Sequence, residues 1–160
     1  MKSVAAAMIL AASLAAPATA HADCDDPGQD PCTGPVPTVD EVVGIMRQLT
    51  DPNIPAANKG NIVSPGFSAD EAGTIDNHLH GMGDVLPLPF TITNIQAAPN
   101  NFAGATVQTT GSYHQYTPPG PIVLVHQKGH WLITHETAMS ALDAFWYNAN
   151  RPFPHVVPAI

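Results

Sequence analysis

The sequence predicts an α+β protein in which helices pack on a four-stranded antiparallel sheet, in the order α-α-β-β-β-β-α. Apolar residues recur at helical spacing in two segments before residue 83 and in one segment after residue 135. Between these segments, apolar and polar residues alternate with a period of two, which is typical of strands. Helices and strands grouped in this way favour an antiparallel sheet covered by helices. The length, 160 residues, suits one folded domain.

The N-terminus carries the pattern of a secretory signal peptide. Met1-Lys2 is a short basic start, an apolar stretch follows over residues 4–16, and small residues at 18–22 form cleavage patterns. The apolar stretch is shorter than the roughly 20 residues that cross a bilayer, so we expect no stable membrane insertion. Asp23 before Cys24 argues against a lipoprotein signal. The predicted layout is a signal peptide at 1–22, a leader at 23–37, a domain at 38–148 and a Pro-rich tail at 149–160.

The leader and its two cysteines form the next feature. Residues 23–37 are rich in Asp, Pro and Gly and hold almost no large apolar side chain, so we expect them to be disordered. Cys24 and Cys32 are the only cysteines of the chain. Because an exported protein meets an oxidising compartment, we expect a disulfide between them.

Two capping boxes locate the first two helices. Thr38-x-x-Glu41 precedes an apolar stripe that Asp51-Pro52 ends, and Ser68-x-x-Glu71 precedes a second stripe that runs to Met82. Between them, residues 53–65 are expected to be a loop with one helical turn at 56–62. Asp40, Glu41, Asp70 and Glu71 all fall in the first turns of these helices, where the helix dipole favours carboxylates. We therefore assign them a structural role.

Four strands and a last helix follow. The alternation predicts a strand from Leu86 through Ile92, a polar loop at 97–104, and a second strand from Ala105 that extends toward Tyr113. The segment 117–121, Thr-Pro-Pro-Gly-Pro, is expected to interrupt the sheet before strands at 121–127 and 130–134. A helix over 136–147 and a loose tail from Arg151 complete the chain.

The turn at Lys128-Gly129 decides whether His126 and His130 can share a metal ion. With a two-residue turn, His126 faces Trp131 and the two histidines point to opposite faces. With a three-residue loop, in which only Gly129 is left-handed, His126 lies opposite His130, and Val123, Val125, Trp131 and Ile133 share one face. We favour the three-residue form. An exposed histidine pair is nevertheless the simpler interpretation than a metal site, because no third ligand is evident.

Composition excludes several other classes of function. The chain has 5 basic and 13 acidic residues, and removal of residues 1–22 takes away Lys2, which leaves a net charge of −9. Such a chain offers no basic surface for nucleic acid. It contains no nucleophile elbow and no phosphate-binding loop, so we predict no enzyme and no cofactor. Lys59, one of the few basic residues, either binds an anion or fixes its loop by pairing with an acid such as Asp51; we favour the loop.

An apolar pocket between helix and sheet is the alternative to a purely structural core. A curved sheet against helices often encloses such a pocket. The residues that would line it are Phe90, Ile92, Trp131, Ile133, Phe145 and Trp146.

Several runs of the sequence resemble the mycobacterial low-molecular-weight secreted antigen family. The runs are Leu49-Thr-Asp-Pro-Asn-Ile, Ala57-Asn-Lys-Gly60, Leu86-Pro-Leu-Pro-Phe-Thr-Ile-Thr-Asn-Ile-Gln96, and the hairpin that begins Val123-Leu-Val-His-Gln. The resemblance as a whole extends over about residues 36–146. The resemblance implies a culture-filtrate protein recognised by T cells, with helices against an antiparallel sheet and no established enzymatic activity.

The expected function follows from these observations together. We predict a secreted, non-enzymatic protein whose partner is an unidentified envelope or host protein. The cell envelope is the alternative location. The alternatives are a carrier of a small apolar ligand in the pocket above, or a weak extracellular metal binder that uses His126 and His130.

Overall fold

The structure of the chain is a computed structural model that describes residues 32–153. It contains three α-helices, α1 (Val39–Leu49), α2 (Ala69–Gly81) and α3 (His135–Asn150), and a 3-10 helix, η1 (Ala56–Asn61). The strands are β1 (Val63–Ser64), β2 (Phe90–Ala98), β3 (Phe102–Thr109), β4 (Thr117–Gln127) and β5 (His130–Thr134). The predicted signal peptide, Cys24, and the end of the tail lie outside the described residues, so the predicted Cys24–Cys32 disulfide stays a prediction.

The sheet has five strands and is mixed, whereas the sequence predicted four antiparallel strands. Its order is β1-β5-β4-β3-β2, and β1 runs parallel to β5 while the other neighbours are antiparallel. The prediction missed β1 because two residues are too short to show an alternation. The register places Val63 beside Ile133 and Ser64 beside Thr134.

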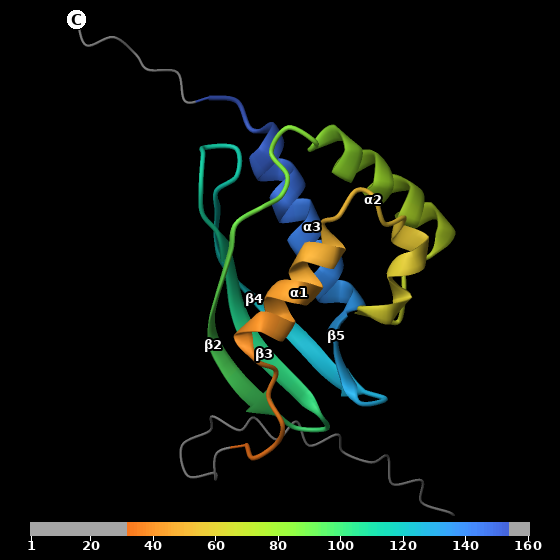
Figure 1. Cartoon of the computed structure of the whole chain (residues 1–160), viewed down its shortest axis with the longest axis vertical. Helices are drawn as coiled ribbons and strands as arrows, with labels where there is room; N and C mark the ends of the chain where they lie inside the picture. Colours follow the sequence, from red (N-terminus) through yellow and green to blue (C-terminus); the bar gives the residue numbers. More distant parts are fainter. Residues whose placement is uncertain (1–31, 154–160) are drawn as a thin grey trace, which may run out of the picture.

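Two helices lie directly against one face of the sheet, and the third lies farther out. Figure 1 shows α1 and α3 against the curved sheet, with α2 on the side away from β2 and β3. α2 packs instead on η1 and on α3. Both predicted capping boxes are confirmed: the hydroxyl groups of Thr38 and Ser68 accept from the backbone N–H groups of Glu41 and Glu71, whose carboxylates return the bond. Each box satisfies two N–H groups that an uncapped helix would leave unpaired.

One apolar core joins the helices and the sheet. The buried residues of the helices and those of the strands form a single cluster. The helical spacing and the alternation in the sequence therefore both mark residues of one core. Representative members are Val42, Ile75, Ile92, Val107, Ile133 and Leu142. We call the face of the sheet that carries Ile92, Val107 and Ile133 the inner face, because it packs on α1.

The β4–β5 hairpin has the two-residue turn, so the favoured three-residue register was wrong. Lys128 and Gly129 both have positive φ, 51° and 84°, which is the backbone of a type I′ turn. The three-residue form was expected because glycine is the usual left-handed residue, but Lys128 adopts that conformation as well. His126 consequently pairs with Trp131 and Gln127 with His130. Since side chains alternate along a strand, Val123 and Val125 face away from Trp131 and Ile133 instead of sharing their face.

Other predicted boundaries shift where proline or asparagine is concerned. The polar loop expected at 97–104 shrinks to three residues, because Asn100 and Asn101 both take positive φ in a tight turn. The proline segment at 117–121 belongs to β4 instead of interrupting the sheet. α3 begins one residue earlier and ends three residues later than the predicted 136–147.

Candidate binding groove between β4 and α3

About half of β4 lacks a neighbouring strand on the side of β5, while β3 pairs with it on the other side, and a groove lies at this open side. β5 pairs only with Leu124–Gln127, while β4 begins at Thr117. At Thr134 the chain leaves the sheet, and α3 then runs beside the uncovered half of β4. The Thr134 hydroxyl donates to the Thr137 hydroxyl over 2.8 Å, which fixes the first turn of α3 at this point.

The groove between the uncovered half of β4 and α3 has a volume of about 540 Å³. We refer to it as the β4–α3 groove. Its walls are mostly apolar. β4 contributes prolines and Ile122, and β3 contributes Val107. α3 contributes Phe145 and two residues with small side chains, Ala141 and Ala144. Its polar members are Thr117, Glu136, Thr137, Ser140 and Asn148. Pockets for ligands are commonly apolar with few polar groups of this kind.

A second furrow meets the groove at the start of α3. It has a volume of about 500 Å³ and shares Val123, Glu136 and Thr137 with the groove. His135 lines it, and the His135 Nε2 lies 3.1 Å from the Glu71 Oε1. The pKa of Glu71 is lowered to about 2, first by the Ser68 backbone N–H, then by the Ser68 hydroxyl and by His135. This pair ties the start of α3 to the start of α2.

The other end of the groove is held by contacts from residues after α3. The Arg151 Nη2 donates to the Tyr113 carbonyl over 2.6 Å, and the guanidinium lies 3.9 Å from the centre of the Tyr113 ring. The Tyr113 hydroxyl donates to the Pro152 carbonyl over 2.8 Å, and Phe153 stacks on the same ring. Residues 151–153 were expected to be loose, but these contacts fix them to the loop before β4. The cation–π contact and the hydrogen bonds thus hold α3 beside the groove.

Asn148 is one of two buried polar residues of the groove, and Thr117 is the other. Asn148 is 7% exposed, and its Nδ2 donates to the Ala144 carbonyl one turn earlier over 2.8 Å. Among the described residues, that is the only hydrogen bond of the side chain, so Oδ1 is left as an acceptor on a groove-lining residue. Sequence reasoning did not single out Asn148, because a polar residue near the end of a helix is ordinarily exposed.

The groove offers few groups for chemistry. In the part of the chain that the structure describes, its lining contains no histidine, lysine, arginine or cysteine and a single carboxylate, Glu136. A hydroxyl nucleophile needs an adjacent base within hydrogen-bond reach, and no hydrogen bond joins Glu136 to Ser140. The arrangement suits binding better than bond cleavage.

The six residues predicted to line an apolar pocket are spread over the molecule. The rings of Phe90 and Phe145 contact each other, with centroids 5.7 Å apart. Trp146 stacks on His78 at 4.3 Å, and Trp131 lies beside His126 at 5.0 Å. Ile92 and Ile133 are buried in the core. Of the six, only Phe145 lines the β4–α3 groove.

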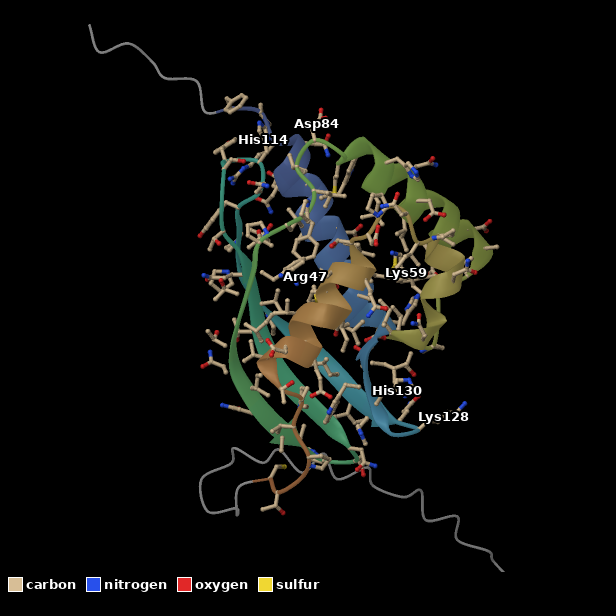
Figure 2. The ribbon with its side chains drawn as sticks, viewed as in Figure 1. Arg47, Lys59, Asp84, His114, Lys128 and His130 are labelled. Atoms are coloured by element: carbon tan, nitrogen blue, oxygen red, sulfur yellow. The ribbon has the colours of Figure 1, made fainter. Side chains whose placement is uncertain are left out.

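The two histidines proposed for a metal site do not form one. His126 and Trp131 share the inner face, so His130, next to Trp131, points to the opposite face. Figure 2 shows Lys128 and His130 at the tip of the hairpin. Within residues 32–153, no three or more histidine, cysteine or acidic side chains come close enough to hold a metal ion.

Lys59 has the structural role that the sequence favoured, but it bonds to backbone carbonyls and makes no ion pair with an acid among the described residues. Its side chain is fully buried, and Nζ donates to the backbone carbonyls of Gln48 and Asp51 over 2.6 and 2.9 Å. Figure 2 shows it beside α1 on the side of η1 and α2. Desolvation lowers the pKa of Lys59 from 10.5 to about 8, although the nearby charges of Asp51 and Asp76 oppose the shift. The Asp76 carboxylate also accepts from the Ala56 N–H over 2.8 Å, so one polar cluster joins α1, η1 and α2.

These features define a class: a small α+β domain whose mixed sheet carries an open, largely apolar groove and, within the described residues, no metal cluster. Its helices include none that is long and apolar enough to span a membrane, as far as residues 32–153 are concerned. Residues 35–148 match the family model "Low molecular weight antigen MTB12, C-terminal domain". The chain therefore belongs to the MTB12 low-molecular-weight antigen family, as the resemblance of its sequence runs predicted.

Individual relatives come from mycobacteria. The chain is 36% identical to low molecular weight antigen MTB12 of Mycobacterium bovis over 119 residues, which is 72% of this chain and 70% of the relative, and the Mycobacterium tuberculosis protein matches equally. The Mycobacterium leprae homolog is 30% identical over 72% of this chain and 71% of the relative. LppK of Mycobacterium tuberculosis, named as a candidate lipoprotein, is 25% identical over 65% of this chain and 57% of its own length.

Proposed function

We propose that this protein is exported and acts outside the cytoplasm as a non-enzymatic binding protein. In this proposal its partner is a protein of the cell envelope or of the host, and the β4–α3 groove holds part of that partner. The observation that carries the proposal is the groove itself. It offers about 540 Å³ of mostly apolar space on a rigid strand and helix, with no paired nucleophile and base in its lining.

The relatives support the location and the absence of catalysis. Three of them are named as antigens and one as a candidate lipoprotein, names that fit proteins exposed beyond the cytoplasm. The basic and apolar start of the sequence has the pattern of an export signal. These relatives' names mention no enzymatic activity.

Site-specific photocrosslinking tests the proposal. A photoreactive amino acid replaces Ser140, which lines the groove, in a protein produced by a mycobacterial host, and illumination of envelope and culture-filtrate fractions follows. We expect a protein adduct that disappears when Ala144→Trp fills the groove. Ala69→Trp is the matched control, because Ala69 is an exposed helical residue outside the groove. An adduct that persists in Ala144→Trp, or that forms equally from a photoreactive group at Ala69, would contradict the proposal.

A further inference from the structure

Two polar residues that line the β4–α3 groove offer unpaired hydrogen-bond acceptors, while the hydroxyls of Thr117, Thr137 and Ser140 can donate or accept. Asn148 contributes its unengaged Oδ1, and Glu136 contributes a carboxylate at the start of α3. Glu136 is exposed and makes no ion pair with another described residue. An occupant that supplies donors to Asn148 and Glu136 is therefore favoured, and so is a positive charge near Glu136.

The backbone of β4 adds a further acceptor. The His126 N–H donates to the Asn101 carbonyl, on the β3 side of β4. Because successive residues of a strand point their N–H and C=O groups to alternate sides, the odd-numbered residues 121, 123 and 125 point away from β3. β5 pairs with β4 only as far back as Leu124, so the Pro121 carbonyl faces the side that β5 has left open.

Proline at position 121 leaves this edge without a donor at that position, although Val123 still has its N–H. Pro121 has no N–H to donate, and its pairing with Thr106 falls at a position where β3 needs none. The open edge can therefore accept hydrogen bonds at Pro121 but cannot form the full ladder that two copies of a free strand would form with each other.

We infer that the β4–α3 groove takes an extended polypeptide segment that donates backbone N–H groups to Pro121 and Asn148 and places a lysine or arginine beside Glu136. The inference rests on the proposed binding function and names the chemistry of the partner. From Glu136 to Asn148, α3 rises about 18 Å, which matches five or six residues of extended chain. A fatty acid matches the apolar walls but supplies neither a positive charge for Glu136 nor an N–H donor for Pro121, so the groove disfavours it.

Defined peptide mixtures test this inference on the exported chain by NMR titration. The probe is an eight-residue mixture with lysine at both ends and Val, Ile, Leu, Ala, Thr and Pro mixed at the six inner positions, so that either direction of binding places a charge near Glu136. Two comparison mixtures carry glutamate at both ends, or lysine ends with every inner amide N-methylated. We expect the lysine mixture to bind at least tenfold more tightly than either, with shifts at Ser140 and Ala144.

Charge reversal provides the matched variants. Glu136→Lys should reverse the preference in favour of the glutamate mixture, and Glu136→Gln should abolish it. Asp70→Lys is the control, because Asp70 is exposed in the first turn of α2 as Glu136 is in the first turn of α3. Asp70→Lys makes the same change of charge and also removes a carboxylate from the first turn of a helix. It should leave the preference for the lysine mixture unchanged.

The outcomes separate the inference from the proposed function. Equal binding of the lysine and glutamate mixtures, no binding of either, undiminished binding of the N-methylated mixture, or tighter binding of dodecanoate would overturn the peptide inference. If Ala144→Trp still removes the Ser140 adduct in that case, the groove remains the binding surface for a partner of different chemistry. Loss of both results would remove the proposed function as well.

Discussion

Lys59 and Asn148 are both buried polar side chains, and the fold uses them in opposite ways. The Lys59 ammonium lies inside the fold, where two backbone carbonyls at the end of α1 accept from it and two carboxylates lie nearby. Asn148 makes one bond to its own helix and leaves its Oδ1 as an acceptor that borders the groove. A buried polar group that joins separate segments of the chain stabilises the fold, whereas an unpaired acceptor at a groove can bond to a partner.

The largest expected effect is the loss of the Lys59 side chain. Lys59→Ala leaves the Gln48 and Asp51 carbonyls without their donor and opens a cavity between α1 and η1, so we expect the free energy of unfolding to fall by about 3 kcal/mol or more. Urea unfolding followed by circular dichroism measures it. Arg47→Ala, an exposed position in the last turn of α1, is the control and should change stability by less than about 0.5 kcal/mol. A loss below about 1 kcal/mol in Lys59→Ala would show that the cluster does not hold the helices together.

Stability should rise with pH between about 8 and 10.5 because of the same residue. The folded pKa of Lys59, about 8, lies below its ordinary 10.5, so the unfolded chain binds more protons in this window. Linkage then makes the free energy of unfolding increase with pH, by about 3 kcal/mol in total, while below pH 8 both states are protonated and the contribution is constant. Unfolding midpoints measured at several pH values should show the rise in the wild type and a flatter profile in Lys59→Met. A wild-type profile that falls over the same window contradicts the assignment.

Asn148→Leu should affect stability far less than the change at Lys59. The only bond of the amide is to a carbonyl of its own helix, and leucine has a similar size, so we expect the free energy of unfolding to change by less than about 1 kcal/mol. The same variant should reduce binding of the lysine-ended peptide mixture several-fold, because it removes the Oδ1 acceptor. Large destabilisation with unchanged peptide binding would mean that Asn148 serves the fold as Lys59 does.

The sequence predicted the features that are encoded locally. The capping boxes at Thr38 and Ser68 placed α1 and α2 correctly, and the β-rich run after the Lys128-Gly129 turn placed β5 at its observed bounds, 130–134. Lys59 stood out because basic residues are rare in this chain. In each case the signal lies within a few residues of the element that it predicts.

The groove depends on where separate strands end relative to one another, so no local sequence pattern predicted it. It exists because β5 stops at Thr134 while β4 extends back to Thr117, and the length of one strand says nothing about the uncovered part of its neighbour. The sequence did not predict β1 for the same reason, because its two residues form a strand only by pairing with β5 at Ile133. The prolines of β4 were interpreted as a break, although a strand with an open edge tolerates them.

The smallest expected change in stability belongs to Pro121→Ala, which tests how the open edge is protected. The Pro121–Thr106 pair requires no N–H from position 121, so we expect the free energy of unfolding to change by less than about 0.5 kcal/mol. The variant adds a donor at position 121 of the edge that faces the groove, and an edge with fewer missing N–H groups invites pairing between copies. Analytical ultracentrifugation over a range of concentrations should therefore detect self-association in Pro121→Ala at concentrations where the wild type shows less. Pro99→Ala, an exposed proline in the turn between β2 and β3 and outside the β4–α3 groove, is the comparison variant. Equal association of both variants and the wild type would indicate that α3, and not the missing N–H, keeps this edge from pairing.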